Sequence, residues 1–133
     1  QIISTKKLLK YLIGKYKIDP KNVLGHSDIA PDRKKDPGEK FPWKVLAKFK
    51  ISKWHDLDEK KLELKRLIQL SSSEEKDFIK NLNKIGYFKL SQRNYNFEKI
   101  RLIEAFQRRF RQKLINGISD QECLTISKDL LKS

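Results

Sequence analysis

A histidine and an aspartate ten positions apart, His26 and Asp36, are the pair in this chain best suited to chemistry. Imidazole nitrogen and carboxylate oxygen are both good donors to zinc. Pro31 and Pro37 exclude a regular helix between them, and the Asp-Pro-Gly run at 36–38 is typical of a turn, so a loop can return Asp36 to His26. A catalytic zinc takes three protein ligands and a water, so one ligand is missing. By residue type alone, a surface hydrogen-bonded pair is the commoner outcome.

The neighbouring segments are expected to place His26 at the end of a strand. Residues 4–16 have the apolar spacing of an amphipathic helix, and residues 21–25 predict a short buried strand. After the loop, residues 41–49 predict a short helix that opens near Pro42. The expected fold of this part is therefore a mixed α/β remnant, in the order helix, strand, loop, helix.

This region resembles the distal motif of the type 2 N-acetylmuramoyl-L-alanine amidases, through GHSDIAP at 25–31, RK at 33–34, DPG at 36–38 and FPW at 41–43. The resemblance implies a zinc enzyme that hydrolyses the amide between N-acetylmuramic acid and L-alanine in peptidoglycan. It implies that His26 and Asp36 are zinc ligands and that Lys34 is a catalytic residue. Asp32 departs from the family, which commonly has Gly there; Gly permits a positive φ more readily than Asp does.

Other polar and aromatic residues of this region have two interpretations each. Arg33 is a candidate for binding a substrate carboxylate, or it holds the loop through backbone carbonyls. Trp43 is a candidate for stacking on a sugar, although an aromatic residue beside apolar neighbours is more often in the core. Asp28 is expected to cap the loop, and His55 is expected to be structural rather than a metal ligand.

The second half predicts an all-α module. Helices are expected at about 74–85, 96–111 and 119–131, after a charged helix or linker at 57–70. In the serine run 71–73, Ser73 is the expected start of the first of these helices, and Gly86 is a turn or C-cap candidate. Residues 82–88 and 97–111, with IEAFQRRF at 103–110, NG at 116–117 and DQE at 120–122, are similar to the helical peptidoglycan-binding module that follows some of these amidases. We therefore expect two domains, with residues 1–70 as the distal part of a catalytic domain and residues 71–133 as a three-helix binding module. In that module, Phe106 and Phe110 are expected to pack in the core, and Cys123 to be a small buried hydrophobe.

The net charge and its distribution along the chain bear on which polymer the protein binds. The net charge is +14, with +9 in residues 1–70 and +5 in residues 71–133. Clusters occur only at 33–35 and 108–111, and no nucleic-acid-binding motif accompanies them. Diffuse positive charge is typical of a solvated surface or of attraction to an anionic polymer, of which peptidoglycan is one. No apolar run approaches the roughly 20 residues that span a bilayer.

The chain begins at Gln1, contains no Met and has only two histidines, so we expect it to be the C-terminal part of a longer amidase, inactive alone. A first zinc histidine and a general base would precede it. The principal alternative is a non-catalytic fragment that binds peptidoglycan or muropeptides; a weaker one is a basic nucleic-acid-binding protein. The amidase interpretation favours the bacterial cell envelope or periplasm, with the cytoplasm as the other possibility. The sequence does not specify an oligomeric state.

Overall fold

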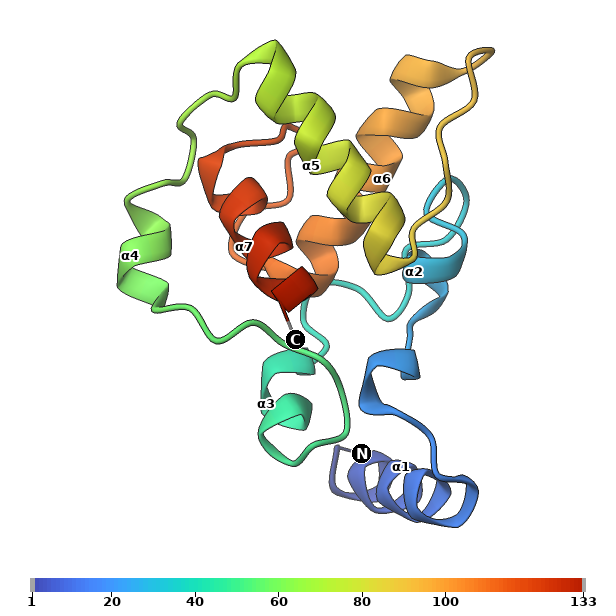
Figure 1. Ribbon diagram of the computed structural model, residues 1–133. Helices are drawn as coiled ribbons and strands as arrows, with labels where there is room; N and C mark the ends of the chain where they lie inside the picture. Colours follow the sequence, from blue (N-terminus) through green and yellow to red (C-terminus); the bar gives the residue numbers. More distant parts are fainter. Residues whose placement is uncertain (1, 133) are drawn as a thin grey trace.

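Helices make up the regular structure of residues 2–132, the part of the chain that the computed structural model describes (Figure 1). In chain order they are α1 (Ile2–Tyr16), the 3-10 helix η1 (Pro20–Asn22), α2 (His26–Ile29), α3 (Trp43–Lys48), α4 (Glu59–Glu63), α5 (Ser72–Ile85), α6 (Tyr95–Phe110) and α7 (Gln121–Lys132). These residues contain no strand, and their β pairing is limited to an isolated bridge between Gln69 and Asp120.

The predicted strand at 21–25, and with it the mixed α/β class, is wrong. Asp19 caps the chain by accepting a hydrogen bond from the backbone N of Lys21 at 3.0 Å, and Pro20 opens η1. Leu24 is 51% exposed, so the apolar residues after η1 do not form a buried strand. A strand needs a neighbouring strand to pair its backbone groups, and no such neighbour exists within residues 2–132. His26 consequently begins helix α2 instead of ending a strand.

The first predicted helix and the helix after the loop are confirmed. α1 covers the expected segment, and α3 starts directly after Pro42. Together they form a small core that also contains parts of the loops around them. Its buried residues are Trp43, Leu46 and Ile51, and it is extended by Leu9, Ile13, Val23, Phe41 and Trp54. This core supports the segment that carries His26.

The three predicted helices of the second half are also confirmed, as α5, α6 and α7. α5 begins earlier than its sequence suggested, because Ser71 rather than Ser73 caps it. The Ser71 hydroxyl accepts from the Glu74 backbone N at 3.2 Å, and the Glu74 carboxylate accepts from the Ser71 backbone N at 2.8 Å. Gly86 ends the helix at a φ of 129°, as its sequence position predicted. In the segment 57–70, only α4 is helical.

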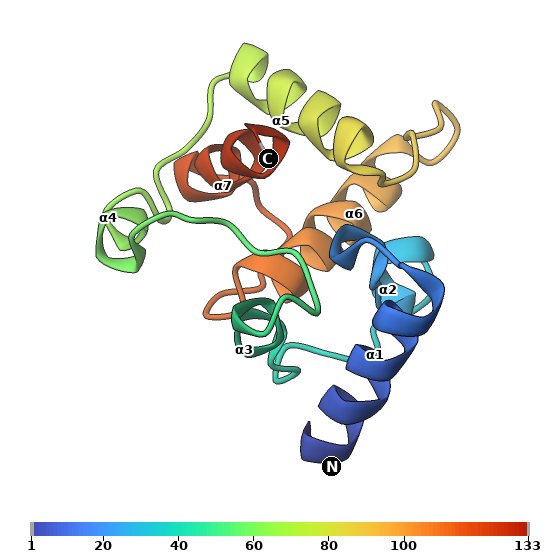
Figure 2. The same cartoon turned by 60° about the horizontal axis from the view of Figure 1, so that its bottom comes forward.

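α5, α6 and α7 enclose the larger core, with α5 and α7 in contact along much of their length (Figures 1 and 2). Phe78 and Phe106 meet edge to face with ring centroids 5.2 Å apart. Phe106 is fully buried and Phe110 is 6% exposed, so both phenylalanines pack as predicted. Cys123 is also fully buried, and burial raises the pKa of its thiol to about 12. The thiol therefore behaves as a small apolar group, as expected.

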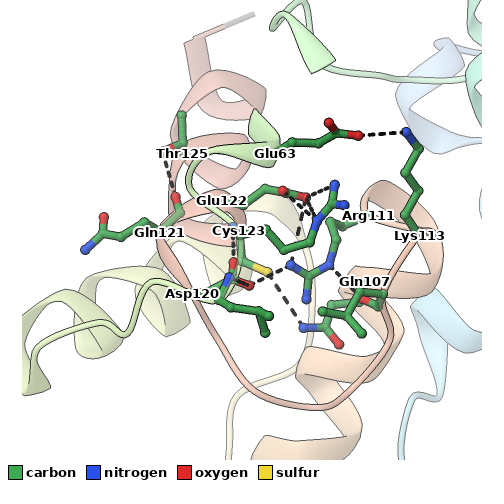
Figure 3. Close-up of polar contacts among 12 residues, drawn as sticks. Glu63, Gln107, Arg111, Lys113, Asp120, Gln121, Glu122, Cys123 and Thr125 are labelled. Carbon is green, nitrogen blue, oxygen red and sulfur yellow. Dashed lines mark hydrogen bonds and ion pairs between the residues drawn. The ribbon is translucent and has the colours of Figure 1, made fainter. Parts of the chain in front are cut away.

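A buried ion network joins the segment after α4 to α6 and α7 (Figure 3). The Arg111 guanidinium donates to the Asp120 carboxylate at 2.6 Å, and Arg66 donates from two nitrogens to Glu122. Burial opposes ionisation of Asp120, but the bond from Arg111 and two backbone N–H groups lower its pKa below the usual value. The charge of Arg111 is thus compensated inside the protein.

Hydrogen bonds also join the two segments that the sequence divides at residue 70. Gln112 donates to the backbone O of Phe41 at 2.8 Å, and the backbone N of Asp56 donates to Asp129 at 3.0 Å. The division into 1–70 and 71–133 stays a prediction, and these contacts show that the two segments touch.

Candidate metal centre

The predicted loop does bring His26 and Asp36 together. The two atoms His26 Nδ1 and Asp36 Oδ2 lie 2.6 Å apart, at hydrogen-bonding distance. Both side chains face solvent, with exposed fractions of 69% and 61%. The pair is therefore preformed and open to a ligand.

Backbone contacts hold the loop in this shape. The backbone N of Ser27 donates to the backbone O of Asp36 at 3.0 Å, which fastens the start of α2 to the far end of the loop. The backbone N of Lys34 donates to the backbone O of Ala30 at 2.9 Å and closes the intervening turn. Asp32 does not adopt a positive φ. Within residues 2–132, the non-glycine residues with a positive φ are Lys17, Lys50 and Leu67. The Asp32 departure from the family motif is therefore compatible with the loop.

Gly25 fills a position where the loop allows no side chain. A Cβ placed there would lie 2.5 Å from Cδ of Pro37 and 3.4 Å from the backbone O of Asp36. The requirement comes from close approach, since the φ of Gly25 is −92°, which any residue adopts. The glycine thus allows the Asp36 turn to pack directly against the start of α2.

The donor types of this pair fit zinc, and the distance between the two donor atoms would fit zinc after they move slightly apart. Two ligands 2.0–2.2 Å from a tetrahedral zinc lie about 3.4 Å apart, which is longer than the hydrogen bond between them here. The exposure of both side chains leaves room for that change. No group of three or more His, Cys, Asp or Glu suited to a metal occurs within residues 2–132. The described residues therefore supply two donors.

Asp36 is held in its ionised form, which is the form that binds a metal. The hydrogen bond from His26 is the largest influence that lowers the pKa of Asp36, and the charges of His26 and Lys34 lower it further. Lys34 is exposed on the same loop, two positions before Asp36. The structure thus gathers the three predicted residues His26, Lys34 and Asp36 on one exposed loop.

The two predicted substrate-binding residues differ in their exposure. Arg33 is exposed, and its backbone N donates to the backbone O of Ala30 at 3.1 Å. Trp43 is only 4% exposed, and the Arg109 guanidinium lies over its ring at 3.5 Å from the centroid. A sugar would have to displace Arg109 to stack on that face. Trp43 therefore serves the core in this structure, which was the alternative interpretation of its sequence context.

Asp28 caps the loop as predicted, and it has a partner that the sequence did not reveal. Its Oδ2 accepts from the backbone N of Gly25 at 2.9 Å, and its Oδ1 accepts from the hydroxyl of Tyr87 at 2.7 Å. Burial, followed by the nearby charge of Asp28, raises the pKa of Tyr87 well above its usual value, so the phenol remains a donor. Tyr87 lies 59 positions away, and nothing in the local sequence marks it. The helical half thus supports the turn on which His26 lies.

His55 and the arginine cluster at 108–111 are both buried. His55 Nδ1 accepts from the backbone N of Leu57 at 3.2 Å, and its ring lies beside Trp54. Arg108, Arg109 and Arg111 are each at most 5% exposed. That cluster therefore cannot form the exposed basic surface that phosphate contacts require.

Comparison with known proteins agrees with the motif. Residues 1–39 match the family model described as N-acetylmuramoyl-L-alanine amidase. N-acetylmuramoyl-L-alanine amidase AmiD of Escherichia coli is 36% identical over 132 residues, which are 99% of this chain and 48% of AmiD. The chain is similar to type 2 amidases. A shorter match joins 32 residues, 24% of the chain and 17% of the relative, to the 1,6-anhydro-N-acetylmuramyl-L-alanine amidase AmpD of Enterobacter cloacae, at 59% identity.

Solved amidase structures share the fold of this chain. A complex of E. coli AmiD with anhydro-N-acetylmuramic acid-L-Ala-D-γ-Glu-L-Lys superposes with a TM-score of 0.84 at 36% identity, covering 99% of this chain and 51% of AmiD. AmpDh3 of Pseudomonas aeruginosa with an anhydromuramic pentapeptide gives 0.78 at 31% identity, covering 98% of this chain and 51% of AmpDh3. The chain thus spans about half the length of AmiD. Within residues 2–132, each helix is too short or too polar to span a bilayer.

Proposed function

We propose that this chain forms the part of a peptidoglycan amidase that contributes two zinc ligands and a catalytic lysine. The reaction is hydrolysis of the amide between N-acetylmuramic acid and L-alanine. The observation that carries the proposal is the contact between His26 and Asp36 at 2.6 Å on an exposed loop. Its support is the 36% identity to AmiD over nearly the whole chain.

His26 and Asp36 would hold the zinc, as two of the three protein ligands that a catalytic zinc takes. A zinc bound there supplies a water of lowered pKa and polarises the scissile carbonyl. The contribution of the chain is to hold both donors at the ends of one closed turn and to keep Asp36 ionised. Because residues 2–132 provide two donors only, we expect no zinc-dependent hydrolysis from residues 1–133 alone.

Lys34 would stabilise the negative charge that develops on the carbonyl oxygen. It lies two residues before Asp36 and is fixed to the same turn by its backbone bond to Ala30. A positioned donor to an oxyanion contributes about 3 kcal/mol, or about a hundredfold in rate. Arg33, its exposed neighbour, is the candidate for holding a substrate carboxylate.

Residues 71–133 would act as a peptidoglycan-binding module. Support comes from their three-helix core and from the sequence likeness to such modules. Binding there would raise the local concentration of the polymer at the His26 loop. A function on peptidoglycan favours the cell envelope or periplasm as the place of action.

A chimera tests the proposal. Residues 1–133 replace the matching half of E. coli AmiD, and the product is assayed with anhydro-N-acetylmuramic acid-L-Ala-D-γ-Glu-L-Lys. We expect zinc-dependent release of the peptide. His26→Ala and Asp36→Ala should each lower the zinc content per molecule, measured by atomic emission, and abolish turnover.

Lys34→Ala should keep full zinc content and lose about a hundredfold in turnover, whereas the adjacent Lys35→Ala should keep both. Equal turnover in the Lys34 and Lys35 variants would remove the catalytic role of Lys34. Full zinc content in the double variant His26→Ala/Asp36→Ala would overturn the metal assignment.

The second candidate function is binding of peptidoglycan without catalysis, which the presence of only two metal donors favours. It predicts that residues 1–133 sediment with insoluble sacculi while the chimera stays inactive. Failure of the chain to sediment would remove this candidate.

A further inference from the structure

A cavity of about 380 Å³ lies between the segment 21–28 and the C-terminal ends of α5 and α7. Cavities of this size hold small ligands. α2, which forms part of one wall, lies beside α6 in both ribbon views (Figures 1 and 2). None of His26, Lys34 and Asp36 lines the cavity, so it is separate from the candidate metal centre.

Positive charge dominates the polar part of the lining. Lys21, Lys53, Lys84 and Arg109 line the cavity, against a single acidic residue, Asp28. Both carboxylate oxygens of Asp28 already accept hydrogen bonds, from Gly25 and Tyr87. The lining therefore carries four basic side chains and one acidic side chain.

Arg109 is the feature that indicates a ligand. It is 2% exposed, and its Nη1 is buried with no hydrogen-bond partner, although the residue lines the cavity. Its other contacts include a long bond from Nη2 to the backbone O of Val23 at 3.4 Å, the stack on Trp43 and the ring of Phe110, whose centroid is 5.3 Å away. Burial lowers the pKa of Arg109 because it disfavours the charged form, and the nearby charge of Asp28 offsets part of this cost. An acceptor placed at Nη1 would offset that cost.

We propose that this cavity binds the carboxylate of a short peptide, with Arg109 as the anchor and Lys84 and Lys21 at the rim. The apolar lining by Leu24, Ile85 and Leu130 suits short aliphatic side chains next to the carboxylate. The choice of peptide rests on the proposed function: the peptide L-Ala-D-γ-Glu-L-Lys, part of the ligand bound by AmiD, carries free carboxylates. The cavity would then hold a second stem peptide of the wall, away from the peptide that is cut.

The test is titration of the full chain, residues 1–133, with L-Ala-D-γ-Glu-L-Lys, acetate or inorganic phosphate, followed by amide chemical shifts. We expect the tripeptide to shift residues 84–87 and 130–131. Lys84→Glu reverses an exposed charge at the rim, and it should weaken the affinity of the chain for the tripeptide about fivefold. The matched reversal Lys60→Glu, on α4 and not on the cavity lining, should change it less than about twofold.

Arg109→Lys keeps the charge and loses the guanidinium fork. If this variant has the helical content of the parent, it should bind the tripeptide about tenfold more weakly. His26→Ala/Asp36→Ala should bind the tripeptide as the parent does, which separates this inference from the proposed function. Shifts confined to the His26 loop, an unchanged affinity in Lys84→Glu, or binding of phosphate but not of the tripeptide would each overturn it.

Discussion

Removing one oxygen atom from Tyr87 should loosen the turn that carries His26. In Tyr87→Phe, the ring keeps its place beside Phe106, and Asp28 loses the bond at 2.7 Å while keeping that from Gly25. A buried hydrogen bond to a charged acceptor contributes about 1.5–3 kcal/mol, so we expect the free energy of unfolding to fall by about 2 kcal/mol. For a chain of 133 residues, that corresponds to a decrease of about 8 °C in Tm.

Urea unfolding followed by circular dichroism at 222 nm measures the loss, and amide hydrogen exchange at Gly25 reports the local effect. We expect faster exchange at Gly25 in the variant, because Asp28 is then oriented by fewer bonds. Tyr11→Phe is the matched control, since Tyr11 is 60% exposed on α1. A loss below about 0.5 kcal/mol, equal to that of the control, would refute the idea that the helical half supports the His26 turn.

Three further substitutions test other parts of the structure. Asp120→Ala leaves the buried charge of Arg111 without its 2.6 Å partner, so the free energy of unfolding should fall by about 3–5 kcal/mol in urea; a loss under about 1 kcal/mol would contradict the network. Gly25→Ala should push Pro37 away, cost about 1–3 kcal/mol and reduce the zinc content of the AmiD chimera; unchanged zinc content would show that the loop adapts. Burial lowers the pKa of His55 below 6.5, so protonation favours the unfolded chain and stability should fall as the pH decreases below about 6.5. His55→Asn, which keeps an acceptor for Leu57, should have a flatter Tm between pH 5 and 7, and equal slopes would contradict this.

Local patterns predicted the helices because each helix is specified by its own residues. The apolar spacing and caps located α5, α6 and α7 to within about two residues, and Ser71 with Glu74 forms a capping box that the serine run only approximated. The strand at 21–25 failed for the opposite reason. A short apolar run fits a strand only if a second strand pairs with it, and no sequence window contains that partner.

The arginine cluster at 108–111 shows that a local sequence pattern also does not predict which charged side chains are exposed. As a sequence it is a run of basic residues, but the structure buries Arg108, Arg109 and Arg111. Arg111 forms an ion pair with Asp120 across the core, and the Arg109 guanidinium lies over the ring of Trp43, which belongs to the other half of the chain. Which charges reach solvent therefore depended on long-range packing.

The sequence by itself determined the donor types of the His26 loop, which belong to the residues, and it predicted the return of Asp36 to His26, because nearby prolines and a glycine favour a turn. Only the tertiary structure decided what supports that loop. Tyr87 reaches Asp28 from 59 positions away, and the lining of the basic cavity comes from segments 21–28, 84–87, 109–110 and 130–131 together with Lys53. Contacts of that separation depend on how the whole chain packs, and no local pattern encodes them.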